Sequence, residues 1–169
     1  MQRKILNQAI ATVRGELVQS GDGLALLTKD GRIDLELTRK RLSPITARTC
    51  VILAGYPRFS PRTRKLQSLA VVGCGFSIQR SPGCLRMSGR IFAVNDKQIV
   101  LEVSPKRLDS FFVPIQGCLP NAEEGQYWRL ECSLEKGLAT LIDAEKLRGA
   151  YVPPKLKRKR SRVRQKVAA

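Results

Sequence analysis

The sequence predicts an all-β protein made of two small five-stranded barrels in tandem, followed by a basic tail. Three observations lead to this prediction. Most segments are short and rich in β-branched and aliphatic residues, Gly, Pro, Asn and Asp turn signals separate them, and their order repeats once along the 169-residue chain. Five short strands leave bare sheet edges unless the sheet closes, so a barrel is the expected arrangement.

The first five strands are expected within residues 1–80. Gly15 interrupts the long first strand, and a glycine inside a long strand marks a bulge or bend. Lys29-Asp30-Gly31 predicts a hairpin turn. Residues 38–43 could form one helical turn before Pro44. The expected strands are Ala9–Ser20, Leu24–Thr28, Ile33–Leu37, Ala47–Gly55 and Leu66–Phe76.

A second unit with the same order is expected within residues 85–150, after a join at Ser81-Pro82-Gly83. Matching segments lie 69 to 78 residues apart, and Gly89 corresponds to the glycine of the first long strand. Ala144–Gly149 is expected to form a short closing helix. The expected strands are Leu85–Val94, Gln98–Val103, Ser110–Ile115, Gln126–Ser133 and Leu138–Asp143.

Each unit has a bent first strand, two hairpins, a longer connection after the third strand and a closing hairpin. This order resembles the OB-fold, a five-stranded Greek-key barrel that binds oligonucleotides over strands two and three and the loops after strands one and four. The resemblance covers both units and rests on order and spacing. Tandem SH3-like barrels, which also have five strands, are the alternative.

Positive charge is concentrated at the two ends of the chain, which has a net charge of +17. Residues 1–85 hold 14 basic and 5 acidic residues, residues 86–150 hold nine of each, and residues 151–169 hold eight basic residues and no acidic ones. Such a field favours polyanions, namely RNA, DNA or an anionic membrane face. The tail has few apolar residues, so a membrane is the weakest of these partners, and we expect no membrane binding.

The segment Tyr56–Lys65 is the strongest candidate site. It combines four cations, two aromatic rings and two prolines without any acidic residue. The resemblance places it in the loop between strands four and five of the first barrel. Arg58, Arg62, Arg64 and Lys65 would contact phosphates, while Tyr56 and Phe59 would stack on bases. In the competing interpretation Phe59 folds back onto the barrel and the cations are only solvated.

Two further basic clusters extend the candidate site. The first could continue the binding track or be a solvated turn. The second belongs to a basic tail, expected to be disordered when free, that would add sequence-independent phosphate contacts or act as a nuclear-import signal. The clusters are Arg39, Lys40, Arg41 and Arg48, and Lys157, Arg158, Lys159, Arg160, Arg162 and Arg164.

Enzymatic and metal chemistry are not expected. The chain has no histidine, which removes Ser-His-Asp and Cys-His catalysis and His-ligated zinc. No two of its five cysteines are separated by two residues, so there is no zinc-ribbon pair. We therefore predict no catalytic residue, metal or cofactor. Neither a secretory signal nor a bilayer-spanning run is recognisable, so a cytoplasmic protein is expected, and association with a nucleoid or a ribonucleoprotein is an open option.

The sequence therefore predicts a non-enzymatic protein that grips single-stranded DNA or RNA with low sequence specificity through its first barrel. The alternative is an adaptor or assembly protein. In that case the neutral second barrel would bind a protein partner or self-associate, and would dock on a ribonucleoprotein, replication or transcription complex. A nuclease is the least favoured option because clustered acidic residues are scarce.

Overall fold

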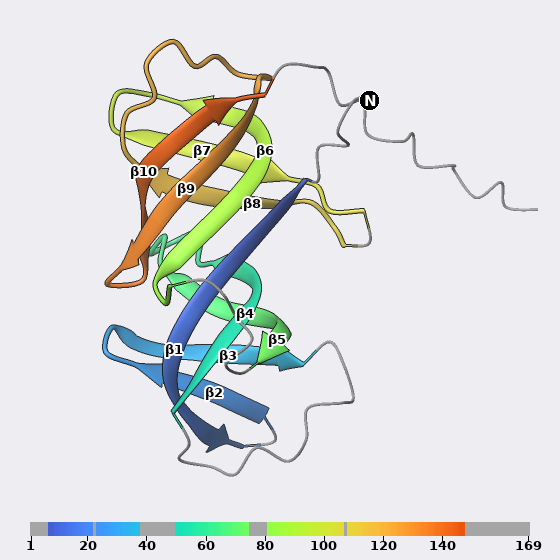
Figure 1. Ribbon diagram of the computed structural model, residues 1–169, viewed down its shortest axis with the longest axis vertical. Coiled ribbons are helices and arrows are strands. Elements are labelled where there is room, and N and C mark those ends of the chain that lie inside the picture. The colour runs from blue at the N-terminus through green and yellow to red at the C-terminus, as the bar shows by residue number, and fades with distance from the viewer. Residues whose placement is uncertain (1–6, 22, 38–49, 75–80, 107, 148–169) are drawn as a thin grey trace, which may run out of the picture.

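The computed structural model describes residues 7–21, 23–37, 50–74, 81–106 and 108–147. These residues form ten strands and no helix, so the expected all-β class is confirmed (Figure 1). The strands are β1 (Gln8–Ser20), β2 (Gly23–Thr28), β3 (Gly31–Leu37), β4 (Cys50–Phe59), β5 (Leu66–Cys74), β6 (Cys84–Val94), β7 (Gln98–Val103), β8 (Phe111–Gln116), β9 (Tyr127–Glu135) and β10 (Leu138–Lys146).

The first five strands close into a barrel. β1 pairs antiparallel with both β2 and β4, β2 pairs with β3, and β4 pairs with β5. A parallel pairing of β3 with β5 completes the ring. Every strand then has two neighbours, which solves the edge problem that the sequence raised. The interior is filled by fully buried leucines, namely Leu17, Leu26, Leu53 and Leu69.

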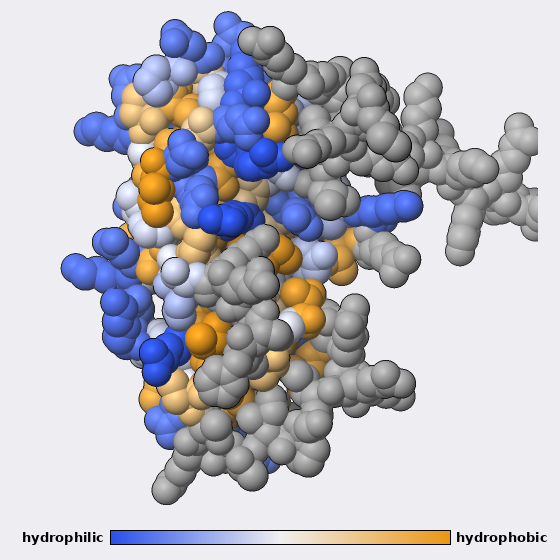
Figure 2. All heavy atoms as spheres, in the orientation of Figure 1, coloured by the Kyte–Doolittle hydropathy of each residue, from blue (hydrophilic) through white to orange (hydrophobic). Residues whose placement is uncertain are grey.

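Strands β6 to β10 repeat the same order of pairings. β6 pairs with β7 and β9, β7 with β8, β9 with β10, and β8 runs parallel to β10. Their buried side chains include Leu85, Leu101, Ile115 and Leu130. On the face shown in Figure 2, hydrophilic side chains are interspersed with smaller apolar areas.

The two groups of strands are joined by a direct strand pairing. Gln8–Thr12 of β1 lies antiparallel to Cys84–Ser88 of β6. In Figure 1 β1 runs from the lower group, β1–β5, up to β6 in the upper group. The Gly83 N–H donates to the Thr12 carbonyl oxygen at 2.7 Å, and the Leu134 N–H donates to the Gly83 carbonyl oxygen at 2.7 Å. Backbone hydrogen bonds therefore fix the halves against each other.

The mid-strand glycines are required by close approach of a neighbouring strand. A Cβ at Gly15 would lie 2.5 Å from the carbonyl oxygen of Leu27 in β2. At Gly89 in β6 a Cβ would meet the carbonyl oxygen of Glu102 in β7 in the same way. Both long strands thus carry a glycine where the next strand of the same group packs against their backbone.

The expected closing helix at Ala144–Gly149 is wrong in the described part, up to residue 147. β10 continues to Lys146, which lies opposite Trp128 of β9. The Ala-Glu-Lys composition favours a helix locally, but β9 is long enough to offer a backbone partner to each of these residues. Tertiary pairing therefore outweighs local propensity.

Candidate nucleic-acid interface

The segment expected to be one long loop is divided between a strand and a short turn. β4 continues through Pro57 to Phe59, because these residues pair with β5. The pairing of β4 with β1 ends at Gly55, so only one side of β4 is paired at Pro57. A proline without an N–H is tolerated at such an edge. The connection itself is therefore reduced to residues 60–65.

Residues 60–65, here called the basic turn, are compact and exposed. The Arg64 N–H donates to the Ser60 carbonyl oxygen at 2.7 Å, and the Ser60 N–H donates to the Lys65 carbonyl oxygen at 2.9 Å. Arg64 adopts a left-handed conformation with φ of 59°. Arg62, Arg64 and Lys65 are exposed on this turn.

The two rings expected to stack on bases are only partly accessible. Phe59 is half-buried and packs against the hydrophobic core. Tyr56 is also half-buried, at a position opposite Ala70 of β5. The position of Phe59 agrees better with the interpretation in which it turns back towards the barrel than with an open stacking platform. The proposed stacking of Phe59 and Tyr56 on bases remains a prediction.

The basic turn and the strand residues on either side of it contact the second half of the molecule. The Arg58 guanidinium carbon lies 4.9 Å from the centre of the Phe111 ring in β8. Arg64 donates from Nη1 to Oε1 of Gln98 in β7 at 2.7 Å. The Leu66 N–H donates to the Gly137 carbonyl oxygen at 2.8 Å. Two of the predicted phosphate-binding arginines are thus held at the junction of the two halves.

An exposed pair of rings lies on the second half, and the sequence interpretation did not include it. Phe92 of β6 is 51% exposed and Phe112 of β8 is 48% exposed. Their ring centres are 4.7 Å apart with a tilt of 59° between the planes. The sequence held one usable signal, because two consecutive phenylalanines in an expected strand point to opposite faces and cannot both enter the core. Since Phe111 is buried, Phe112 must face outward.

A groove of about 560 Å³ lies between the basic turn and Phe112. Its lining residues, among those that the structure describes, include two arginines and no aspartate or glutamate. One wall comes from the end of β4 and the basic turn, and the other from β7 and β8. The lining residues are Arg58, Phe59, Ser60, Pro61 and Arg64, and Gln98, Val100, Phe111, Phe112 and Pro114. The groove therefore combines positive charge with an exposed aromatic ring.

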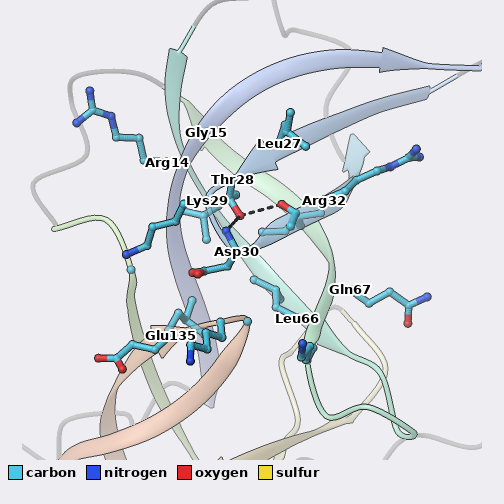
Figure 3. A pocket seen from close by; sticks show the side chains of 18 of the residues that line it. Arg14, Gly15, Leu27, Thr28, Lys29, Asp30, Arg32, Leu66, Gln67 and Glu135 are labelled. Atoms are coloured by element: carbon cyan, nitrogen blue, oxygen red, sulfur yellow. Dashed lines mark hydrogen bonds between the residues drawn. The ribbon is translucent and has the colours of Figure 1, made fainter.

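A larger hollow of about 940 Å³ has a different character (Figure 3). It lies between the β2–β3 turn and the β9–β10 turn, and its lining contains both basic and acidic side chains. Figure 3 shows Asp30 on the β2–β3 turn, with Glu135 of β9 below it in that view. Arg32 forms an ion pair with Asp34 at 2.8 Å. Carboxylates offset most of the positive charge in this hollow, whereas the smaller groove has none among its described lining, so this hollow is the weaker candidate.

The remaining predicted site residues lie outside the described residues. They are Arg39, Lys40, Arg41, Arg48, Lys157, Arg158, Lys159, Arg160, Arg162 and Arg164.

The five cysteines are free thiols. Burial raises the pKa of the Cys132 thiol to about 12. Burial also raises the pKa of the Cys84 thiol, and the Glu131 carboxylate beside it adds to the shift. Both groups therefore stay protonated at neutral pH, so neither offers a thiolate nucleophile there.

No group of three or more His, Cys, Asp and Glu side chains is placed to hold a metal ion in the described ranges. Those ranges also contain no helix of the length and apolar character needed to cross a bilayer. A comparison of the sequence with protein-family models and with curated proteins finds no match. What the protein does is therefore inferred from the groove, its charge and its rings.

Proposed function

We propose that this protein is a non-enzymatic, cytoplasmic nucleic-acid-binding protein that holds single-stranded DNA or RNA with low sequence specificity. One observation carries the proposal. The groove between the halves brings Arg58 and Arg64 beside the exposed ring of Phe112, with no acidic residue among its described lining. Cations neutralise the phosphate backbone, and ring faces accept bases of any identity.

We further propose that residues 1–80 and 85–150 are tandem OB-like barrels, with residues 151–169 as a basic tail. The order of pairings in each group supports this, because a five-stranded Greek-key ring is the arrangement on which many oligonucleotide-binding sites are built. SH3-like barrels are the alternative. The net charge of +17 supports a polyanionic ligand over a neutral one.

The test is a binding titration with single-stranded DNA, single-stranded RNA and duplex of matched sequence, at about 50 and 200 mM salt. Two triple variants with the same change in net charge are compared with the wild type. The groove variant is Arg58→Gln, Arg62→Gln and Arg64→Gln. The control variant, at exposed lysines away from the groove, is Lys29→Gln, Lys136→Gln and Lys146→Gln.

We expect the groove variant to bind single strands about 10- to 100-fold more weakly at the lower salt. The slope of log affinity against log salt should decrease by about 2, because each lost phosphate contact removes about 0.7. In the control variant, both the affinity for single strands and the salt slope should decrease much less. Equal losses in the two variants would show that only net charge matters and would reject the groove. Absence of binding by the wild type would reject the function.

An adaptor function is the second candidate, because the second half exposes large apolar side chains. Phe92 and Phe112 are about half exposed, and Ile142 of β10 is 64% exposed. Exposed apolar groups of this kind also mark protein interfaces. A protein partner that binds the wild type and not a Phe92→Ser, Phe112→Ser variant, combined with absent nucleic-acid binding, would favour this candidate.

A further inference from the structure

The ring pair on the second half lies beside the cations of the first half. Phe92 and Phe112 come from β6 and β8, and β7 lies between these two strands. Arg58 is held against Phe111, the residue directly before Phe112. Phe112 itself lines the groove together with Arg58 and Arg64. Phe112 from one half and two guanidinium groups from the other thus face the same space, and Phe92 contacts Phe112 beside it.

The acidic residue nearest to the rings in the sheet is neutralised by an arginine. Glu102 of β7 lies opposite Phe112 in the sheet and is the nearest acidic residue in the pairing register. Arg90 binds it through Nη2 at 2.5 Å, which compensates its charge. A phosphate backbone that passes the rings would therefore meet no uncompensated carboxylate at this position.

The groove continues past the Arg64–Gln98 contact. A second hollow of about 660 Å³ is also lined by Arg64, Gln98 and Pro114. It adds the cation of Lys97 and one carboxylate, Asp96, so its described charged lining is net positive. A strand that follows both hollows would pass the Arg64 guanidinium in the middle of its path.

We propose that Arg58, the basic turn and the Phe92–Phe112 pair form one composite site, in which the second half stacks bases and the first half neutralises phosphates. This inference rests on the proposed function and goes beyond it, because it assigns base contact to the half with no net charge. The occupant is single-stranded nucleic acid. Only a single strand offers both unstacked bases for the rings and phosphates for the arginines.

The experiment separates stacking from phosphate contact with two labelled strands of about 12 nucleotides, which one or two small barrels can cover. One strand is oligothymidylate, and the other is an abasic strand with the same phosphates and no bases. The test variant is Phe92→Leu, Phe112→Leu, which keeps apolar side chains in both strands. The control variant is Val72→Ala, Ile142→Ala, which changes two exposed apolar side chains elsewhere.

We expect the wild type and the control variant to prefer oligothymidylate over the abasic strand by about 10- to 100-fold, which is the effect of one to two stacked bases. In the ring variant this preference should fall to less than about twofold, while its affinity for the abasic strand stays unchanged. Arg64→Gln should lower the affinity for both strands by the same factor. Thermal unfolding of each variant checks that the fold is retained.

The outcomes distinguish the two proposals. If the ring variant keeps the preference, or the wild type has none, the composite site is rejected while phosphate binding stands. If the wild type binds neither strand, the nucleic-acid function itself is rejected.

Discussion

Replacement of Gly15 by alanine should destabilise the protein, because β2 packs directly against this position of β1. The new methyl carbon would lie 2.5 Å from the carbonyl oxygen of Leu27 and 2.8 Å from Cγ of Leu26. Carbon atoms in contact are normally separated by about 3.5 Å or more, so β2 has to move by about 1 Å. Leu27 pairs with Glu16, the next residue of β1, so this movement also strains the ladder.

The magnitude follows from these two effects. Overpacking of a well-packed site costs about 1–3 kcal/mol, and each weakened ladder hydrogen bond adds up to about 1 kcal/mol. We therefore expect Gly15→Ala to lower the free energy of unfolding by about 2–4 kcal/mol. For a chain of this size a loss of about 3 kcal/mol lowers Tm by about 6–12 °C.

Urea denaturation followed by circular dichroism measures this loss, and Gly73→Ala is the matched control. Gly73 lies in β5, and a Cβ there would meet no heavy atom within 4 Å. Alanine at Gly73 should be neutral or stabilise by about 0.4–1 kcal/mol, because it restricts the unfolded chain. If Gly15→Ala were as stable as Gly73→Ala, the close approach of β2 to β1 would be refuted.

Three further predictions concern the core, the thiols and the junction. Leu101→Ala, at a fully buried side chain, should cost about 2.7–5 kcal/mol in urea denaturation, and a loss below about 1 kcal/mol would contradict that burial. The pKa of Cys132 is about 12, so iodoacetamide at about pH 8.5 should modify exposed Cys118 much faster than Cys132. Equal modification rates of the two thiols, measured by mass spectrometry, would show that Cys132 is accessible. A double-mutant cycle of Arg58→Met and Phe111→Leu should give a coupling of about 0.5–1 kcal/mol, whereas additive effects would mean that the cation–ring contact is absent.

Many elements of the fold are encoded by residues close in sequence, and these could be predicted. The run Ile33–Leu37 alternates apolar and acidic residues and lies within β3. Lys29-Asp30-Gly31 gave the turn before β3, where Gly31 has a φ of 130°. The bounds of β7, Gln98–Val103, agree with the prediction at both ends. Alternation and turn chemistry are local properties, so one sequence is enough to read them.

The lengths of β4 and β10 depend on partner strands and could not be predicted in the same way. Two prolines and a run of cations suggested that β4 ends at Gly55, but β5 offers partners up to Phe59. A helix-favouring composition suggested that β10 ends at Asp143, but β9 pairs with it up to Lys146. Strand ends are decided by the length of the neighbouring strand, which local composition does not contain.

For a related reason, the cations of the candidate site could be predicted from the sequence, but its ring contacts could not. The cations of the basic turn are visible as composition, and the structure places Arg62, Arg64 and Lys65 on its surface. The meeting of Phe92 with Phe112 requires the strand order β6–β7–β8, and the contact of Arg58 with Phe111 joins residues far apart in the chain. Such contacts follow from topology, and no residue pattern within either half reports them.

The contact between Arg58 and Phe111 bears on how the proposed site would work. An unrestrained arginine has about 2 kcal/mol of rotamer freedom to lose when it binds a phosphate. Packing against Phe111 restricts the guanidinium before any ligand arrives, so less of this freedom is lost on binding. A guanidinium can meet a ring with its face while its N–H edge still donates to phosphate oxygens. In the proposed site, the junction of the halves would therefore pre-organise the Arg58 guanidinium without using up its donors, and we expect a lysine at position 58, with equal charge and no planar face, to be a poor substitute.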